Sequence, residues 1–147
     1  MMKAIEINMV VSDSLKALEL YEKIFEDIER VEVTNFNQGE NEAIFNLFGM
    51  RIHMLDENPQ FQLKAPDSEH PNTMWFNVVV PDIKNTYDKA IAAGCKEIQP
   101  VTEMKEYGIS NAIFTDPFGY QWLLHQIHQE MSFEERMQVW EENKENE

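Results

Sequence analysis

The stretch Asn8-Met9-Val10-Val11-Ser12-Asp13 returns 69 residues later as Asn77-Val78-Val79-Val80-Pro81-Asp82. Four of the six positions are identical, and both copies run from an apolar segment into an aspartate. An apolar run of this length is typical of a β-strand, and an aspartate directly after it is placed to cap the N-terminus of a helix. Each copy therefore predicts a strand that leads into a helix.

A second pair of matching segments follows the first pair in the same order. Ala43-Ile44-Phe45 matches Ala112-Ile113-Phe114 at the same offset, and Phe48-Gly49 matches Phe118-Gly119 one residue later. Two short matches in register along a chain indicate an internal repeat, in which one structural unit occurs twice.

Both copies show the same predicted order of elements, namely strand, helix, strand, strand, strand. The apolar positions at helical spacing are Leu15, Leu18, Tyr21 and Phe25 in the first copy and Ile83, Tyr87, Ala90 and Ile91 in the second. The predicted strands cover residues 5–11, 31–36, 43–48 and 50–55, and then residues 74–80, 97–101, 109–115 and 120–127. The sequence thus predicts an α+β fold made of two βαβββ modules.

The whole chain, residues 1–147, is expected to form one domain, because this length is ordinary for a single hydrophobic core. Module one takes about residues 1–56 and module two about residues 74–128. Residues 57–73 carry three prolines and many polar side chains, which predicts a linker between the modules.

A helix is also predicted at the C-terminal end of the chain, over about residues 132–142. Ser132-Phe133-Glu134-Glu135 has the form of a capping box, which marks a helix start. Phe133, Met137 and Trp140 then lie on one face of that helix. Three large apolar side chains on one face require a cover, either from this domain or from a partner subunit.

Composition restricts the partners and the compartment. The formal net charge of −15 repels phosphate backbones, so we expect no nucleic-acid partner. No segment approaches the roughly 18 uninterrupted apolar residues of a membrane span, and Glu6 and Asn8 interrupt the first apolar run, so neither a membrane partner nor a signal peptide is expected. The single cysteine, Cys95, excludes an internal disulfide and fits a reducing compartment. We therefore expect a cytoplasmic protein.

Several phrases of module two resemble one known superfamily. They are Val79-Val80-Pro81-Asp82, Ala92-Ala93-Gly94-Cys95, Tyr107-Gly108 and Phe114-Thr115-Asp116-Pro117-Phe118-Gly119. With the doubled βαβββ module, they resemble the vicinal-oxygen-chelate (glyoxalase/bleomycin-resistance) superfamily. The segment from Asp116 to Trp122 and the tail 126–137 are similar to its PhnB-like branch. The resemblance covers about residues 4–140, and it implies an open, cup-shaped sheet and a homodimer.

The resemblance also implies a divalent metal held by four side chains, one from the first and one from the last strand of each module, where the ion acts as a Lewis acid. The corresponding positions in this sequence are Glu6, His53, Trp75 and Leu123. Glu6 and His53 are able to bind a metal, whereas an indole and a leucine are not. We therefore predict no metal and no other cofactor, although a weak two-ligand site stays open if another group completes it.

Alternation along the strands predicts the side chains that line the cup, with Tyr107 at its rim near a turn. The predicted ligand-binding residues are Asn8, Arg51, Trp75, Asn77, Tyr107, Gln121, Leu123 and His125, and the catalytic candidates are Glu6 and His53. Structural alternatives stay open. Glu6 would pair with Arg51, Asn8 and Asn77 would bond to each other, and Trp75 would be either plain core or a flat wall for a ligand.

Two functional hypotheses follow from these residues. In the first, the protein is a metal-free binding protein whose cup holds a small, partly aromatic or amphipathic molecule. The alternative is a lyase, isomerase or dioxygenase-type enzyme that acts on a small oxygenated substrate, with Glu6 or His53 as general base or metal ligand. A methyltransferase is not supported, because no glycine-rich nucleotide loop is present. We favour the binding function.

Overall fold

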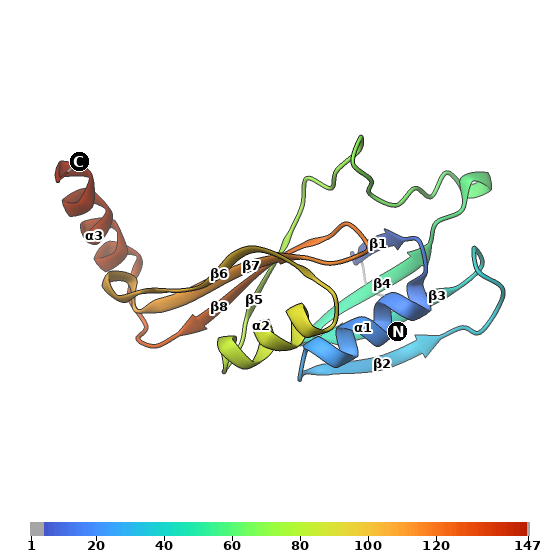
Figure 1. The fold of residues 1–147 in the computed structure, drawn as a ribbon, viewed down its shortest axis with the longest axis horizontal. Helices are drawn as coiled ribbons and strands as arrows, with labels where there is room; N and C mark the ends of the chain where they lie inside the picture. The colour runs from blue at the N-terminus through green and yellow to red at the C-terminus, as the bar shows by residue number, and fades with distance from the viewer. Residues whose placement is uncertain (1–4, 147) are drawn as a thin grey trace.

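The computed structural model describes residues 5–146 and shows the predicted α+β fold (Figure 1). Module one consists of β1 (Ile7–Val11), α1 (Ser14–Ile24), β2 (Ile28–Val33), β3 (Glu42–Leu47) and β4 (Met50–Asp56). Module two consists of β5 (Phe76–Val79), α2 (Ile83–Ala92), β6 (Lys96–Met104), β7 (Ile109–Thr115) and β8 (Gln121–Ile127). Two short 3-10 helices, η1 (Pro59–Phe61) and η2 (Lys105–Tyr107), and the C-terminal α3 (Phe133–Glu145) complete the chain.

The two modules have the same sheet topology, which confirms the internal repeat. Their strand orders are β1-β4-β3-β2 and β5-β8-β7-β6, and in each the first strand runs parallel to the last. The register is shared as well, since Asn8 lies opposite His53 and Asn77 lies opposite Leu123. Within residues 5–146 no strand pairing joins the two sheets, so the cup inferred from the sequence is divided into two four-stranded sheets.

Both long module helices begin as the repeated aspartates predict. The side chain of Asp13 accepts a hydrogen bond from the backbone N–H of Lys16, and Asp82 accepts one from Asn85, each at 3.1 Å. These bonds satisfy an N–H group that has no partner inside the helix. The aspartate after each first strand therefore fixes where the chain turns from sheet to helix.

One hydrophobic core runs through both modules, and α1 and α2 pack against each other within it. Burial alternates along the strands, so that Trp122 and Leu124 are buried while Leu123 and His125 are only partly covered. The indole of Trp122 lies 5.2 Å from the ring of Tyr21 and 4.9 Å from that of Phe25, measured between ring centroids. The strand face turned away from α1 and α2, which we call the open face, carries Asn8 and His53 in module one and Asn77, Leu123 and His125 in module two.

Polar contacts also tie the modules together. The hydroxyl of Tyr21 donates to Oδ2 of the buried Asp116 at 2.6 Å, and Nε1 of Trp122 donates to the same oxygen at 2.9 Å. The hydroxyl of Tyr120 accepts from the backbone N–H of Val10 at 3.1 Å and donates to the Val10 carbonyl at 2.9 Å. Side chains of module two thus complete the hydrogen bonding of β1 in module one.

Several boundaries differ from the sequence-based expectation. The first strand of module two was expected over residues 74–80, but β5 covers Phe76–Val79, so Trp75 lies just before the strand. The second strand was expected from residue 31, but β2 begins at Ile28, because α1 ends at Ile24 and Ile28 pairs directly with Leu47 of β3. The linker is not entirely irregular, since it contains η1 and an isolated bridge between Asn58 and Leu63.

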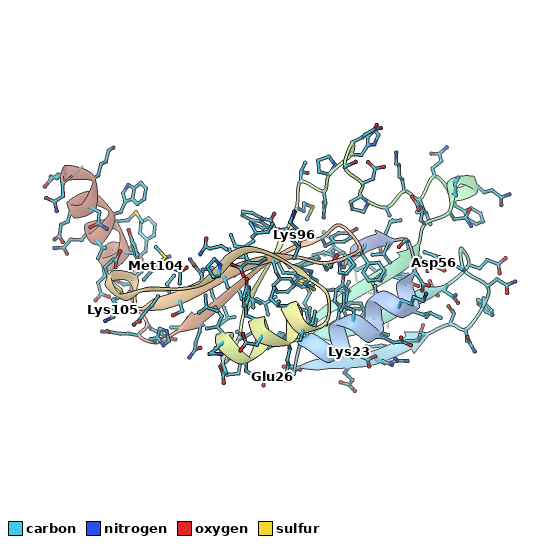
Figure 2. The ribbon with its side chains drawn as sticks, in the orientation of Figure 1. Lys23, Glu26, Asp56, Lys96, Met104 and Lys105 are labelled. Carbon is cyan, nitrogen blue, oxygen red and sulfur yellow. The ribbon has the colours of Figure 1, made fainter. Side chains whose placement is uncertain are left out.

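The C-terminal helix is present, and its capping box forms between Ser132 and Glu135. It extends from one end of module two and packs against η2, close to Met104 at the end of β6 and Lys105 at the start of η2 (Figures 1 and 2). The expected cover for its apolar face is incomplete, because Phe133 and Trp140 remain largely exposed. None of the described helices is long and apolar enough to cross a membrane.

Candidate functional site

The open face of module one carries a cluster of ionisable side chains around His53. Nδ1 of His53 lies 2.9 Å from a carboxylate oxygen of Glu6, and Nε2 lies 2.8 Å from a carboxylate oxygen of Glu42. Arg51 adds a second positive group, with Nε 3.5 Å from Glu6. The proposed pairing of Glu6 with Arg51 is confirmed, and His53 lies between two carboxylates.

The surroundings of His53 determine its charge. Burial by itself would lower the pKa of its imidazole, but the hydrogen bonds and charges of Glu6 and Glu42 outweigh burial and raise this pKa above 6.5. The pKa of Glu6 is lowered, chiefly by its hydrogen bond with His53. Both nitrogens of a protonated imidazole are hydrogen-bond donors, so His53 satisfies both carboxylates and retains no lone pair.

The equivalent positions of module two carry no ionisable side chain. The shared register aligns Glu6, Glu42, Arg51 and His53 with Trp75, Asn111, Gln121 and Leu123, respectively. A metal ion would need further nitrogen or oxygen donors here, and Trp75 and Leu123 supply none. With His53 already bonded through both nitrogens, the side chains present do not fit the four-ligand metal site.

His125 forms a different polar contact on the open face of module two. Its Nδ1 lies 2.5 Å from Oδ1 of Asn77. Burial lowers the pKa of His125, which favours the neutral imidazole at neutral pH. Since the amide oxygen only accepts, the neutral ring donates from Nδ1 and keeps Nε2 as an acceptor. The alternative in which Asn8 and Asn77 bond to each other is not seen among the described residues, and Asn77 bonds to His125 instead.

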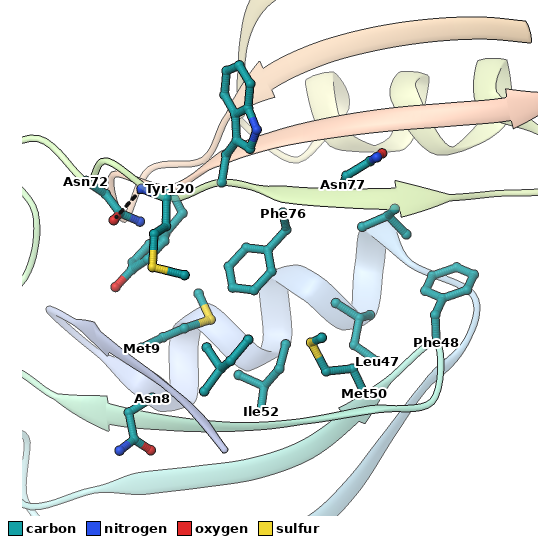
Figure 3. Close-up of a pocket in the computed structure, with 14 residues that line it drawn as sticks. Asn8, Met9, Leu47, Phe48, Met50, Ile52, Asn72, Phe76, Asn77 and Tyr120 are labelled. Atoms are coloured by element: carbon teal, nitrogen blue, oxygen red, sulfur yellow. Dashed lines mark hydrogen bonds between the residues drawn. The ribbon is translucent and has the colours of Figure 1, made fainter. Parts of the chain in front are cut away.

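A groove of about 370 Å³ lies between the edges of β1 and β5 (Figure 3). It is predominantly apolar, with the amides of Asn8 and Asn77 and the ring of Tyr120 among its lining groups. Its principal apolar residues are Met9, Met50 and Ile52 of module one and Met74, Trp75 and Phe76 of module two. Trp75 is 55% exposed, so the hypothesis that it is plain core is wrong.

The turn between β3 and β4 shapes one end of this groove. Phe48 and Gly49 have φ angles of 47° and 82°, so both residues of the two-residue turn are left-handed. Successive positive φ angles give the turn a twist that matches the twist of a hairpin, and glycine adopts them without strain. The turn places Phe48 beside Leu47 and Met50 at the groove (Figure 3).

The predicted site residues do not all converge on one place. Asn8, Trp75 and Asn77 line the groove between β1 and β5, whereas Tyr107 and His125 line a second groove beneath α3, which Asn77 also borders. The other predicted residues, namely Glu6, Arg51, His53, Gln121 and Leu123, line neither groove.

Sequence reasoning missed two contributors to these sites. One is Glu42, which bonds to His53 because β3 and β4 pair in the register that sets Ile44 opposite His53. The alternation of Glu42, Ile44 and Asn46 along β3 was a usable signal for that face. The other is α3, whose Arg136, Met137 and Trp140 line the second groove.

The sequence pattern of the Glyoxalase/Bleomycin resistance protein/Dioxygenase superfamily matches residues 4–124. Since this match spans most of the chain, the protein belongs to that superfamily. A curated relative is an uncharacterized protein of Mycobacterium bovis, which is 24% identical over 135 residues, or 90% of this chain and 88% of the relative.

Solved structures of low sequence identity share the fold. The fosfomycin resistance protein FosX from Listeria monocytogenes, solved with Mn(II) and a sulfate ion, has a TM-score of 0.66 at 15% identity, with 95% of this chain and 98% of that chain covered. The PhnB protein of Bacillus cereus has a TM-score of 0.61 at 15% identity, with 84% of this chain and 99% of that chain covered. These likenesses establish the architecture alone.

Proposed function

We propose that this protein binds a small molecule in the groove between β1 and β5 and does so without a metal ion. The observation that carries the proposal is that the ionisable cluster and the apolar groove lie in different places. Glu6 and His53 bond to each other on the open face of module one, whereas Trp75 stands 55% exposed in a separate apolar groove. A concave apolar surface with a few polar groups is the usual form of a small-molecule site.

The lining of the groove indicates the kind of ligand. The indole of Trp75 and the thioethers of Met50 and Met74 offer flat and adaptable apolar contacts, which favour an aromatic or branched apolar body. The amide of Asn8 offers donors and an acceptor for a neutral polar substituent, and the amide of Asn77, whose oxygen accepts from His125, offers its NH₂ donors. We therefore expect an uncharged or weakly polar aromatic ligand.

The ligand site is tested with Trp75 as a fluorescent reporter in a Trp140→Phe variant. In this variant Trp75 is the exposed indole, while Trp122 stays buried and constant. Small aromatic compounds are titrated, and a saturable change in emission is expected for compounds that fit. Trp75→Phe should keep binding when it is followed by calorimetry, because the flat apolar surface is retained, whereas Trp75→Ala should weaken it. A Trp75 that acrylamide cannot reach would contradict the proposal.

The absence of a metal requirement is tested separately. We expect purified protein to carry no stoichiometric divalent ion at Glu6 and His53, and we expect added Mn(II) to leave the His53 NMR signals unbroadened. The proposal is wrong on this point if elemental analysis finds about one zinc, nickel or manganese per chain that a Glu6→Ala variant loses.

An enzymatic function is the second candidate, and one observation favours it. Burial lowers the pKa of His125 and so favours its neutral form, and its Nε2 makes no hydrogen bond to any described residue, as a general base requires. Glu6 and His53, the bases expected from the sequence, suit the role less well. The lowered pKa of Glu6 makes it a weak base, and a protonated His53 has no lone pair to accept a proton.

Two further proposals concern the family branch and the assembly. The segment Asp116-Pro117-Phe118-Gly119-Tyr120-Gln121-Trp122 supports membership of the PhnB-like branch. We also propose a homodimer, because β1 and β5 are sheet-edge strands and Phe133 of α3 is exposed. Light scattering at tens of micromolar should give twice the mass of one chain, and a monomer mass would contradict the dimer.

A further inference from the structure

The second groove lies between the open face of module two and α3, and it has a volume of about 500 Å³. Its floor comes from β5, β7 and β8, and its opposite wall comes from α3. α3 packs against η2 and extends from one end of module two (Figure 1), and its Arg136, Met137 and Trp140 line the groove.

The protein leaves apolar surface uncovered on both sides of this groove. Val79 and Ile127 on the strands are 51% and 46% exposed, and Trp140 on the helix is 60% exposed. Covering a large apolar side chain with an apolar group removes it from water and so stabilises a complex. An occupant with an apolar body would therefore gain contacts with the sheet and with the helix together.

Arg136 gives the groove a positive charge that no carboxylate of the described chain neutralises. Arg30 pairs with Glu22 at 2.7 Å and Arg51 pairs with Glu6 at 3.5 Å, but Arg136 makes no ion pair within residues 5–146. Its guanidinium lies over the ring of Phe133 instead, with Cζ 5.9 Å from the ring centroid. Among the three arginines, all of which lie within residues 5–146, Arg136 is therefore the one without an ion pair there.

The sequence of α3 accounts for this isolation. The helix contains five glutamates, yet the positions three and four residues from Arg136 are Ser132, Phe133, Val139 and Trp140. Those are the positions from which a helical side chain reaches its neighbours. No glutamate of α3 therefore occupies the spacing from which it would pair with Arg136, and the guanidinium remains available to a ligand.

We propose that this groove binds an amphipathic organic anion, with its apolar body between Val79, Ile127 and Trp140 and its carboxylate on Arg136. Such a ligand matches both the apolar walls and Arg136, the one arginine or lysine that lines the groove. A guanidinium binds a carboxylate through two parallel hydrogen bonds, which gives both strength and orientation. This site is separate from the groove between β1 and β5, although Asn77 borders both.

The test uses a Trp75→Phe variant, in which Trp140 is the exposed indole and Trp122 is buried. Decanoate and decanol, which share a chain and differ in the charge of the head group, are titrated below their micellar concentrations. We expect decanoate to change Trp140 emission saturably and decanol to bind more weakly. Arg136→Gln should weaken decanoate binding roughly tenfold and leave decanol binding unchanged.

Lys144→Gln is the matched control, because it removes one positive charge from the same helix at a residue that does not line the groove. It should leave decanoate binding unchanged, whereas Arg136→Lys should retain part of it. An equal loss in Lys144→Gln would show general charge attraction and would overturn the proposal. Binding of decanol and decanoate with equal affinity would overturn it as well.

Two other outcomes assign the groove differently. If decanoate changes the emission of Trp75 in the Trp140→Phe variant but never that of Trp140, the anion binds between β1 and β5 and the present proposal is wrong. Sedimentation provides the second outcome. If the protein is a dimer that Trp140→Ala dissociates and that added decanoate leaves intact, a second copy of the chain fills the groove and the present proposal is wrong. A response from Trp140 alone supports this site even when the groove between β1 and β5 binds nothing.

Discussion

The open faces of the two modules have the same strand order and register, but they differ in the charge of their side chains. Module one holds Glu6, Glu42, Arg51 and His53 in one cluster, whereas module two has Trp75, Asn111, Gln121 and Leu123 at the equivalent positions. The ionisable side chains of module one form hydrogen bonds and ion pairs with one another. The open face of module two instead leaves apolar side chains exposed beside the grooves. The comparison teaches that an internal repeat conserves backbone register while side-chain chemistry diverges between copies.

The largest expected effect on the free energy of unfolding distinguishes the buried Trp122 from the exposed Trp75 in module two. Trp122→Ala should reduce the free energy of unfolding by roughly 3–5 kcal/mol, because the indole is fully buried and donates to Asp116. Trp75→Ala should reduce it by about 1 kcal/mol or less, since that side chain is half exposed. Urea unfolding followed by circular dichroism measures both. Equal losses would show that Trp75 supports the core and is not a wall of the groove.

The next effect concerns Tyr120, whose repeat counterpart in module one is the exposed Met50. Tyr120→Phe removes the hydroxyl that bonds to both backbone groups of Val10, and we expect it to cost about 1–2 kcal/mol of unfolding free energy. Met50→Leu is the matched control and should change stability little. If the two substitutions behave alike, the contact between the modules contributes nothing measurable.

The two open-face histidines should respond to pH in opposite directions. The folded pKa of His53 is raised, so its stabilising contribution is complete below pH 6.5 and is lost as the pH rises through the folded pKa. The folded pKa of His125 is lowered, so its contribution is complete well above pH 6.5 and is lost as the pH falls. Because His53 is partly exposed and screened by solvent, we expect only about 0.5–1 kcal/mol from it.

This contrast is measured by subtracting the stability of His53→Leu and of His125→Leu from that of the parent protein at each pH between about 5 and 9, a range that brackets the ordinary histidine pKa. The His53 difference should decline with rising pH, and the His125 difference should increase. Two differences with the same sign of slope would contradict the assigned charge states. His53→Leu also gives module one the residue that module two has at Leu123.

The smallest effect is expected from Arg51→Gln. This substitution gives module one the residue type that module two has at the equivalent position, Gln121. The Arg51–Glu6 pair spans 3.5 Å and is partly exposed, so its loss should change stability by about 0.5 kcal/mol or less. NMR titration of His53 provides the second measurement, and its pKa should remain raised because Glu6 and Glu42 are still present. A return of this pKa to 6.5 would show that Arg51 organises the cluster.

The repeat allowed most of the fold to be predicted from the sequence. Asn8 and Asn77 with their following aspartates located both first strands and both helix starts, and alternation placed Asn8 and Asn77 at exposed strand positions, whereas Trp75 lies just before β5. The pairing of Glu6 with Arg51 was also foreseen. These features follow from local periodicity and short-range capping, which sequence encodes directly.

Features that depend on long-range geometry were not predicted. The bond of Glu42 to His53 requires the register of β3 against β4, and the groove beneath α3 requires the direction in which the chain leaves β8. The periodicity of apolar residues within one segment carries no information on strand register or on the direction in which the chain leaves a strand.

Because the phenol of Tyr21 donates to a carboxylate from the other module, neither module is expected to reach its native state alone. Separated from module two, Tyr21 and Phe25 would lose the ring of Trp122, and β1 would lose the hydroxyl of Tyr120. Folding should therefore be a single cooperative event even though the architecture is duplicated. A protease that cuts the linker between the modules should leave two fragments that stay associated and melt together, as a reconstituted whole.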